Sequence, residues 1–255
     1  MIVLKSPREI TLMREAGQIL VAAMRMCRDL VKPGVSTLEI DREVEALIRE
    51  RRAKPAFKGY RGFPATICAS INEEVVHGIP AATRRLEEGD IVGLDLGAIV
   101  DGYYADAAMT LPVGEVSERA RRLIEVTREA LDLAIAQARP GRRLGDVSAA
   151  VQRHAERAGF GVVRSFVGHG IGRALHEDPQ VPNFGEPGKG PLLRPGMVLA
   201  IEPMVTMGHW EVRVLKDRWT AVTEDGSLAA HFEDTVAVTD AEPDVLTRPA
   251  RAEAA

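Results

Sequence analysis

The chain has 255 residues, of which 45% are hydrophobic, so it can bury a sizeable core in one domain or in two closely joined halves. Its net charge of −4 and its pI near 5.9 leave no basic footprint for a nucleic acid or an anionic membrane surface. These values therefore exclude the strongly basic binding proteins.

Cysteine usage and the N-terminal residues indicate where the protein works. Cys27 and Cys68 are the two cysteines, and neither lies in a metal-type Cys pair or a disulfide framework. Charged residues follow the start too soon for a signal peptide, and no apolar run approaches the roughly 18 residues that span a bilayer. We expect a cytoplasmic protein in a reducing compartment, with no membrane partner.

Helix signals open both parts of the chain. The stretches "SPRE" at residues 6–9 and "STLE" at residues 36–39 each hold a capping serine with a glutamate three positions later, and apolar residues at helical spacing follow. Residues 118–138 and 144–158 show apolar stripes of the same spacing. The sequence therefore predicts two pairs of helices.

A strand pair is predicted between the helix pairs. The apolar run at residues 91–100 contains Asp95, although strands usually exclude aspartate. An Asp-Gly turn follows, so residues 103–110 should pair antiparallel with this run. Asp95 and Asp106 then share one face of the sheet, about 7 to 8 Å apart at the backbone. Two carboxylates so placed require protonation, an Arg or Lys, or a metal cation.

An internal repeat relates the two parts of the chain. A Pro-Gly pair before the second predicted helix recurs 107 residues later, before the fourth, and the pattern that leads to Asp95 recurs ahead of Glu202 at the same offset. A pseudo-twofold axis would therefore bring Glu202 to the two aspartates. His169 in a Gly-His-Gly setting and Glu233 in a late strand are further candidate ligands.

The same repeat predicts the domain organisation. Residues 1–245 should form a single domain, with halves at roughly 1–115 and 116–245 that each hold a helix pair followed by strands. The chain ends in "RPARAEAA", a low-complexity stretch. We expect residues 246–255 to be a disordered tail.

Five candidate ligands, in their order along the chain, resemble the metal site of the type I methionine aminopeptidases, also called methionyl aminopeptidases: Asp95, Asp106, His169, Glu202 and Glu233. The stretches "GYRGFPATICASINEEVVHGIP" and "IEPMVT" also match the family, and the resemblance covers roughly residues 3–240. It implies a single catalytic domain of the α/β (α+β) class with the pita-bread fold. In that fold, two pseudo-symmetric halves of a helix pair and antiparallel strands surround a central curved sheet.

The resemblance implies a metallopeptidase that hydrolyses the N-terminal methionine from peptides and nascent proteins. Two divalent ions per chain (Co, Mn, Fe(II), Ni or Zn) are expected, with Asp106 and Glu233 spanning both, and they would activate a water molecule. Glu202 is expected to serve also as the general base. By the same resemblance, His77 lies near the scissile nitrogen and His176 donates to the developing oxyanion.

An apolar pocket should hold the methionine side chain. By resemblance its wall consists of Tyr60, Phe63, Cys68 and Trp219, with Phe57 and Leu175 at two more wall positions. The better-known bacterial pattern more often has a cysteine where this chain has Phe57 and a phenylalanine where it has Leu175. Such a pocket discriminates by roughly 1 to 3 kcal/mol per methylene. A preference for a small second residue is implied by the family.

Two alternatives remain open at this point. A related X-Pro aminopeptidase or dipeptidase would keep the metal ligands but normally carries a large N-terminal domain, and only 76 residues precede His77. A non-catalytic pita-bread binding protein would discard ligands, and this chain keeps all five. The resemblance implies a monomer that acts on peptide and nascent-protein N-termini, in transient proximity to the ribosome. No nucleic-acid partner is expected.

Overall fold

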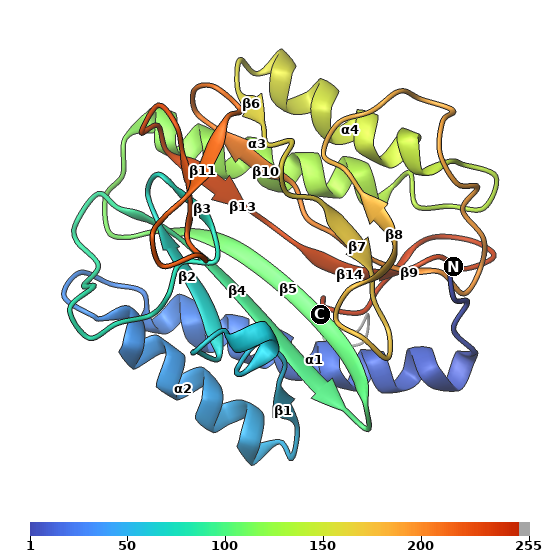
Figure 1. Cartoon of the computed structure of the whole chain (residues 1–255), viewed down its shortest axis with the longest axis horizontal. Helices are drawn as coiled ribbons and strands as arrows, with labels where there is room; N and C mark the ends of the chain where they lie inside the picture. The colour runs from blue at the N-terminus through green and yellow to red at the C-terminus, as the bar shows by residue number, and fades with distance from the viewer. Residues whose placement is uncertain (250–255) are drawn as a thin grey trace.

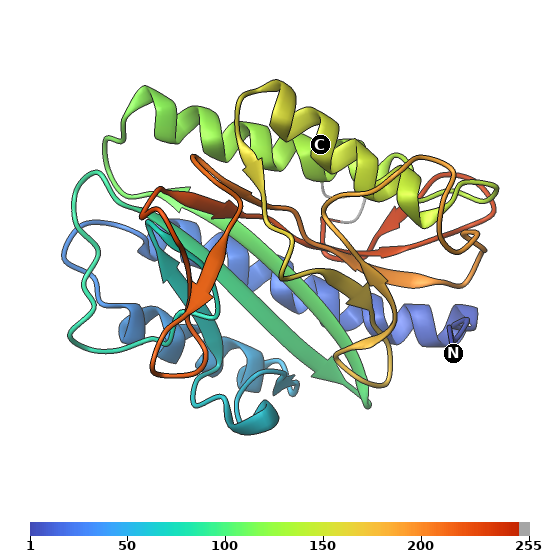
Figure 2. The same ribbon diagram turned by 45° about the horizontal axis from the view of Figure 1, so that its top comes forward.

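The strands of the protein lie between two pairs of helices (Figures 1 and 2). The computed structural model describes residues 1–249. The helices are α1 (Pro7–Leu30) and α2 (Thr37–Glu50) in the first half of the chain and α3 (Glu118–Ile135) and α4 (Leu144–Arg157) in the second. All four helices occupy the segments that the sequence predicts. In the part of the chain described, no helix is long and apolar enough to cross a membrane.

Capping bonds explain where the first two helices begin. The Ser6 hydroxyl accepts a hydrogen bond from the Glu9 N–H at 3.4 Å, and the Glu9 carboxylate accepts one from the Ser6 N–H at 2.9 Å. Ser36 and Glu39 make the same reciprocal pair, at 3.3 and 2.7 Å. These bonds satisfy N–H groups that have no partner inside the helix. The capping boxes predicted from sequence are confirmed.

Antiparallel pairing organises the strands. The first half holds β1 (Lys54–Pro55), the 3₁₀ turn η1 (Tyr60–Gly62), β2 (Ile67–Ile71), β3 (Glu74–Val76), β4 (Ile91–Val100) and β5 (Tyr103–Pro112). The second half holds β6 (Gly161–Val162), β7 (Gly168–Gly170), β8 (Glu177–Val181), β9 (Val198–Ile201), β10 (Met204–Thr206), β11 (Val212–Val214), β12 (Ala221–Thr223), β13 (Ala229–His231), β14 (Asp234–Ala237) and β15 (Asp244–Val245). Strand β4 lies between β1 and β2 and also pairs with β5, and a second sheet has the order β15-β14-β9-β7-β8.

The two halves meet along a seam between β5 and the chain around Glu233. Ala108 and Glu233 exchange both backbone hydrogen bonds, at 3.2 and 2.9 Å. On one side of this pair, the Thr235 hydroxyl accepts from the Asp106 N–H at 2.9 Å and donates to the Asp106 carbonyl at 2.8 Å. The hydroxyl thus satisfies both backbone groups of a buried residue.

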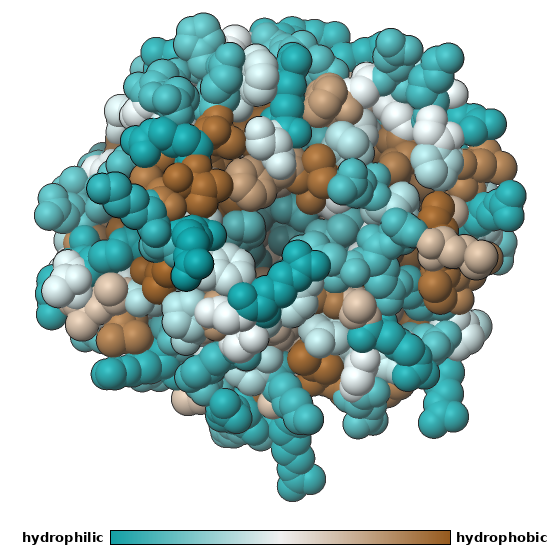
Figure 3. Space-filling model, viewed as in Figure 1, coloured by the Kyte–Doolittle hydropathy of each residue, from teal (hydrophilic) through white to brown (hydrophobic). Residues whose placement is uncertain are grey.

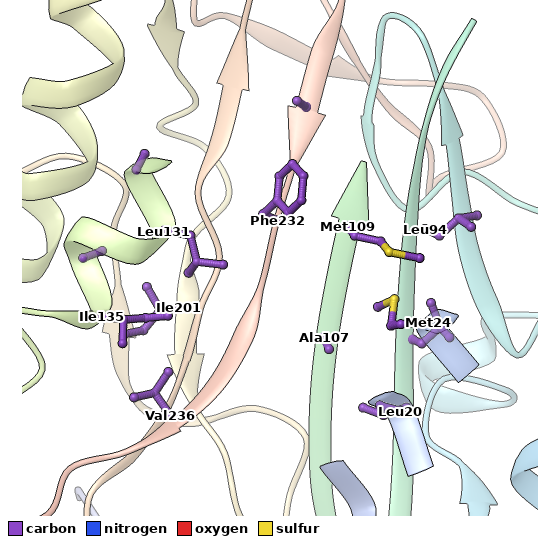
Figure 4. Packing of buried hydrophobic residues seen from close by; sticks show 14 of the residues in the cluster. Leu20, Met24, Leu94, Ala107, Met109, Leu131, Ile135, Ile201, Phe232 and Val236 are labelled. Carbon is purple, nitrogen blue, oxygen red and sulfur yellow. The ribbon is translucent and has the colours of Figure 1, made fainter. Parts of the chain in front are cut away.

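Each half of the protein contributes its own group of buried side chains to the hydrophobic core (Figure 4). Leu20 and Met24 of α1 point toward Met109 and Leu94 on the β4–β5 hairpin, whereas Leu131 and Ile135 of α3 lie near Ile201 and Val236 on β9 and β14. All of these side chains are buried. Full burial of one large aliphatic side chain stabilises the fold by about 1.5 to 3 kcal/mol. Each helix pair is therefore held on its own strands by the apolar stripe seen in the sequence.

Two expectations are corrected by the structure. Part of the segment predicted as a disordered tail is packed: Leu246 is fully buried, and the Arg248 guanidinium pairs with the Asp234 carboxylate at 2.7 Å. Residues 250–255 of that predicted tail lie outside the described residues. Glu233 does not lie within a regular strand but in an isolated bridge between β13 and β14. Its backbone leaves those strands in order to pair with β5.

Candidate active site

A cavity of about 160 Å³ lies where the two halves meet. The face of the molecule seen in Figure 1 is also hollowed near its centre in the space-filling view (Figure 3). Every residue that the sequence analysis assigned to the site lines this cavity, together with Arg61: Phe57, Tyr60, Phe63, Cys68, His77, Asp95, Asp106, His169, Leu175, His176, Glu202, Trp219 and Glu233. The structure therefore brings the whole predicted set together.

The β4–β5 hairpin presents the two aspartates. Val100 faces Tyr103, and Asp106 lies opposite Gly97, which is the register predicted from the turn. The turn residues Asp101 and Gly102 have positive φ of 47° and 82°, as a two-residue hairpin of this type requires. Because side chains alternate, Asp95 and Asp106 share a face. The prediction that the two aspartates lie on the same face of the sheet is confirmed.

The pKa values of these aspartates show how costly their position is without a cation. Burial raises the pKa of Asp95 to about 6. Burial first, and then the negative charges of Asp95 and Glu202, raise the pKa of Asp106 well above its usual range. Both shifts favour the protonated, neutral form. A positive charge in the cavity would reverse them.

His169 is held as a neutral imidazole that faces Glu202. Its Nδ1 lies 2.9 Å from the Gly170 carbonyl and donates to it, which leaves Nε2 without a proton, 3.6 Å from Glu202 Oε1. Burial lowers the pKa of His169 to about 3. The flanking glycines permit this placement, because a Cβ at Gly168 would lie 2.4 Å from the Ala200 carbonyl oxygen of β9. An imidazole so arranged has a lone pair free for a metal.

The carboxylates from the second half complete the donor set. Glu202 follows β9 directly, and burial raises its pKa well above the usual range. Glu233 is 4% exposed, and burial together with the charges of Asp106, Glu202 and Asp95 raises its pKa in the same direction. Four acidic groups from both halves therefore face one another.

These residues fit divalent metal ions. Asp95 Oδ1, Asp106 Oδ1 and Glu233 Oε1 are buried and have no hydrogen-bond partner. Ligand atoms of Asp106, His169 and Glu233 lie within 4.8 Å of one another, close enough to share one ion. Unpaired buried oxygens are costly unless a cation compensates them. Hard oxygen donors with imidazole nitrogen, and no thiolate among them, are typical of Mn, Fe(II) or Co(II) sites.

Two more histidines line the cavity beside this cluster. The Tyr60 hydroxyl lies 2.9 Å from His176 Nδ1, and the two rings stack with centroids 5.4 Å apart. His77 follows β3 with a φ of 62° and packs edge-on against Phe166 and Trp219. Burial first, and then the nearby His231 and His176, lower the pKa of His77 to about 4. Burial also lowers the pKa of His176.

Apolar side chains form another part of the cavity wall. Phe63 packs edge-on against Trp219, with centroids 5.1 Å apart, and Phe57 and Leu175 are both buried beside them. Phe57 lies directly on β4: a Cβ at Gly97 would be 2.7 Å from its ring. The two positions at which this chain departs from the common bacterial pattern are therefore part of the wall.

Two residues near the site were not found from the sequence. Arg61, in the 3₁₀ turn η1, lines the cavity with its guanidinium 5.3 Å from the centre of the Tyr60 ring. It lies within the stretch that matches the family, but the sequence assigned it no role. His231 forms a second group of potential ligands with Glu202 and Glu233. His231 precedes Glu233 by two positions in an extended segment, and strand alternation could have shown that both face the same way.

Comparison with known proteins shows the family to which this chain belongs. The model of metallopeptidase family M24 matches residues 11–240. A methionine aminopeptidase of Clostridium acetobutylicum is 53% identical over 247 residues, which cover 97% of this chain and 99% of the relative. The crystal structure of a Thermotoga maritima methionine aminopeptidase has a TM-score of 0.96 at 50% identity, over 98% of this chain and 100% of that one.

More distant structures share the fold over part of their length. The prolidase of Pyrococcus horikoshii has a TM-score of 0.79 at 26% identity and is matched over 98% of this chain but only 64% of its own. The pita-bread arrangement predicted from the sequence is confirmed by these matches, and by the full-length match to the Thermotoga maritima structure above all.

Proposed function

Because this chain belongs to metallopeptidase family M24, and within it to the methionine aminopeptidases, we propose how its own residues remove an N-terminal methionine. The observation that carries the proposal is the meeting of four carboxyl groups and one neutral imidazole in a single cavity, with three of their oxygens unpaired. Within the described residues, no protein group hydrogen-bonds to these three oxygens. Metal ions would compensate them.

The ions would be held by Asp95, Asp106, His169, Glu202 and Glu233. We propose two divalent ions, drawn from Co, Mn, Fe(II), Ni and Zn, because four carboxylates carry more negative charge than one divalent ion neutralises. When bound, such ions supply Lewis acidity and make a water nucleophile available at neutral pH. The buried donors need this charge in order to ionise.

Glu202 is proposed to move the proton. Its side chain is 13% exposed, so it lies at the edge of the cluster and faces the cavity. Burial raises the pKa of Glu202 above its usual range, which makes its carboxylate a stronger base than an exposed one. It would accept the proton from water and deliver it to the leaving amine.

His176 and His77 are proposed to contact the substrate. If Tyr60 donates to His176 Nδ1, His176 Nε2 carries the proton and donates to the carbonyl oxygen of the first peptide bond as it becomes negative. His77 is neutral near pH 7, since its pKa is lowered to about 4, and it is proposed to bind at the scissile nitrogen. Both imidazoles act through positioned hydrogen bonds.

The methionine side chain is proposed to occupy the apolar wall formed by Tyr60, Phe63, Cys68, Trp219, Phe57 and Leu175. The cavity volume of about 160 Å³ accommodates one unbranched thioether side chain together with the ions. We also propose a preference for a small second residue. The natural substrates are proposed to be peptides and nascent proteins with accessible N-termini.

Metal removal tests this function. The protein is stripped with a chelator, Mn(II), Fe(II) or Co(II) is restored singly, and methionine release from Met-Ala-Ser is compared with release from Leu-Ala-Ser and cleavage of Xaa-Pro peptides. We expect no turnover without metal and cleavage mainly of Met-Ala-Ser with it. Preferential Xaa-Pro cleavage would support a dipeptidase instead, and no cleavage with any metal would support a binding protein.

A further inference from the structure

Lys5 is a buried cation near the start of the chain, and the proposed reaction does not use it. Its side chain is 4% exposed, and its ammonium donates to the Glu177 carboxylate at 2.6 Å and to the Val3 carbonyl at 3.1 Å. Glu177 is 16% exposed and directly follows His176, which lines the cavity. A buried ion pair contributes little net stability, because desolvation of the two charges offsets much of their attraction. The position of this pair therefore calls for another explanation.

The Glu177 carboxylate also closes a short loop that holds two residues of the cavity. Its Oε1 atom accepts a hydrogen bond from the Ala174 N–H at 3.2 Å, and its Oε2 atom accepts from Lys5. Leu175 and His176 lie between the two ends of this closure. One carboxylate thus fixes the shape of the loop and connects it to the N-terminal segment.

Lys5 itself is held firmly, because its backbone is fixed on the second half of the protein. Its N–H donates to the Gly196 carbonyl at 2.7 Å, in the turn that leads into β9. Gly196 has a φ of 88°, and a Cβ there would lie 2.9 Å from the Lys5 carbonyl oxygen. The lysine stem also packs against the segment before the loop, where a Cβ at Gly172 would lie 2.4 Å from Lys5 Cε and 2.7 Å from Glu177 Oε1. Two glycines therefore make room for this lysine.

We propose that Lys5 is a positioning residue, which acts through Glu177 to hold His176 where its imidazole meets the developing oxyanion. This inference rests on the proposed function, because Lys5 acts only through the role of His176. The His176 ring lies with its centroid 4.2 Å from that of His169, and its Nδ1 atom lies 2.9 Å from the Tyr60 hydroxyl. A displaced loop would change both contacts. Misplacement of a reacting group by about 1 Å can lower a rate about 100-fold.

Loss of the ion pair without an unpaired buried charge tests the proposal. In the double variant Lys5→Met/Glu177→Gln, methionine keeps the packing of the lysine stem, and the glutamine oxygen can still accept the hydrogen bond that closes the loop. We expect kcat for Met-Ala-Ser to fall by at least about tenfold and KM to change by less than about threefold, because His176 is proposed to act in the transition state. The control Arg139→Gln breaks an ion pair of the same length, 2.6 Å to Glu242, outside the cavity. It should change neither value.

A kinetic double-mutant cycle separates positioning from a general structural role. We measure kcat for wild type, Lys5→Met/Glu177→Gln, His176→Ala and the triple variant, all loaded with Co(II). If Lys5 acts through His176, the loss of at least about tenfold should shrink to less than about twofold once the imidazole is gone. Glu177→Gln alone leaves the N-terminal segment unaltered, and its smaller loss should likewise disappear in the His176→Ala background. Melting temperatures of the same proteins show that each is folded at the assay temperature.

The outcomes distinguish this inference from the proposed function. Wild-type kcat in Lys5→Met/Glu177→Gln, or an equal loss of kcat with and without the His176 imidazole, would overturn the role of Lys5 alone. Wild-type kcat in His176→Ala would contradict the proposed role of His176 and with it that of Lys5. No cleavage of Met-Ala-Ser by the metal-loaded wild type would contradict the proposed function itself.

Discussion

At the scale of single residues, a buried carboxylate ionises only where something positive compensates it, and Asp106 shows this most clearly. It is 4% exposed, its Oδ1 atom has no partner, and burial with the neighbouring charges raises its pKa well above the usual range. In the metal-free protein, the ionised form of such a buried residue is unfavourable. Binding of a cation stabilises the ionised form and so offsets this unfavourable free energy.

Asp106→Asn tests this exchange. The amide keeps the shape of the side chain but removes one negative charge, so we expect turnover to fall by at least about 100-fold and divalent metal binding to weaken. The melting temperature of the metal-free protein should stay equal or rise, because a crowded acidic group is lost. Peptide cleavage, metal titration and thermal melting are compared with Asp101→Asn in the exposed hairpin turn. Wild-type turnover in Asp106→Asn would remove Asp106 from the mechanism.

At the scale of elements, the start of α1 is tied to the start of β5. Glu9 Oε1 accepts a hydrogen bond from the Tyr103 hydroxyl at 2.6 Å. This bond, followed by those from Ser6, lowers the pKa of Glu9 to about 2. One carboxylate thus serves the capping box of the helix and also joins that helix to the hairpin that carries Asp106. Local and tertiary contacts support the same position.

A pH-dependent double-mutant cycle tests this link. Because the folded pKa of Glu9, about 2, lies below the ordinary value of 4.5, its contribution to stability is fully present above about pH 4.5 and is lost as the pH falls toward 2. We expect a stabilising coupling between Glu9→Gln and Tyr103→Phe at pH 7 that shrinks below pH 4.5. Denaturant unfolding of wild type, both single variants and the double variant at pH 7, 5 and 3 measures it. A coupling independent of pH would contradict this account.

At the scale of the whole molecule, the seam between the halves fixes the site. Asp106 belongs to the first half and Thr235 to the second, and the Thr235 hydroxyl satisfies both the N–H and the carbonyl of Asp106. Thr110 does the same for His231 on the other side of the Ala108–Glu233 pair. The backbones of these site residues are therefore set by contacts between the halves.

Thr235→Val removes one of these links without changing the side-chain shape. Two buried backbone groups of Asp106 lose their partner, and each costs about 1 to 3 kcal/mol. We expect the free energy of unfolding to fall by at least about 2 kcal/mol, and metal affinity to fall with it. Denaturant unfolding of the metal-free protein gives the first value. The exposed control Thr11→Val should change the free energy of unfolding by less than about 0.5 kcal/mol. An equally small effect in Thr235→Val would show that the Thr235–Asp106 contact does not stabilise the protein.

Local features of this protein were readable from the sequence because near neighbours in the chain decide them. The capping boxes at Ser6 and Ser36 and the register of the β4–β5 hairpin follow from residues within a few positions of one another. The facing of Asp95 and Asp106 depends only on a two-residue turn and strand alternation. The family resemblance then indicated the other ligands and the cavity wall.

Only the tertiary structure decided which distant segments meet. Leu246 is buried although its surroundings look like a frayed tail, and His231 stands against Glu202 although no motif includes it. Glu233 leaves its strand to pair with Ala108, a contact between residues 125 positions apart. Such contacts depend on how the two packed halves dock against each other. The docking is decided by many contacts between residues far apart in the chain, and no short stretch of sequence contains both partners of such a contact.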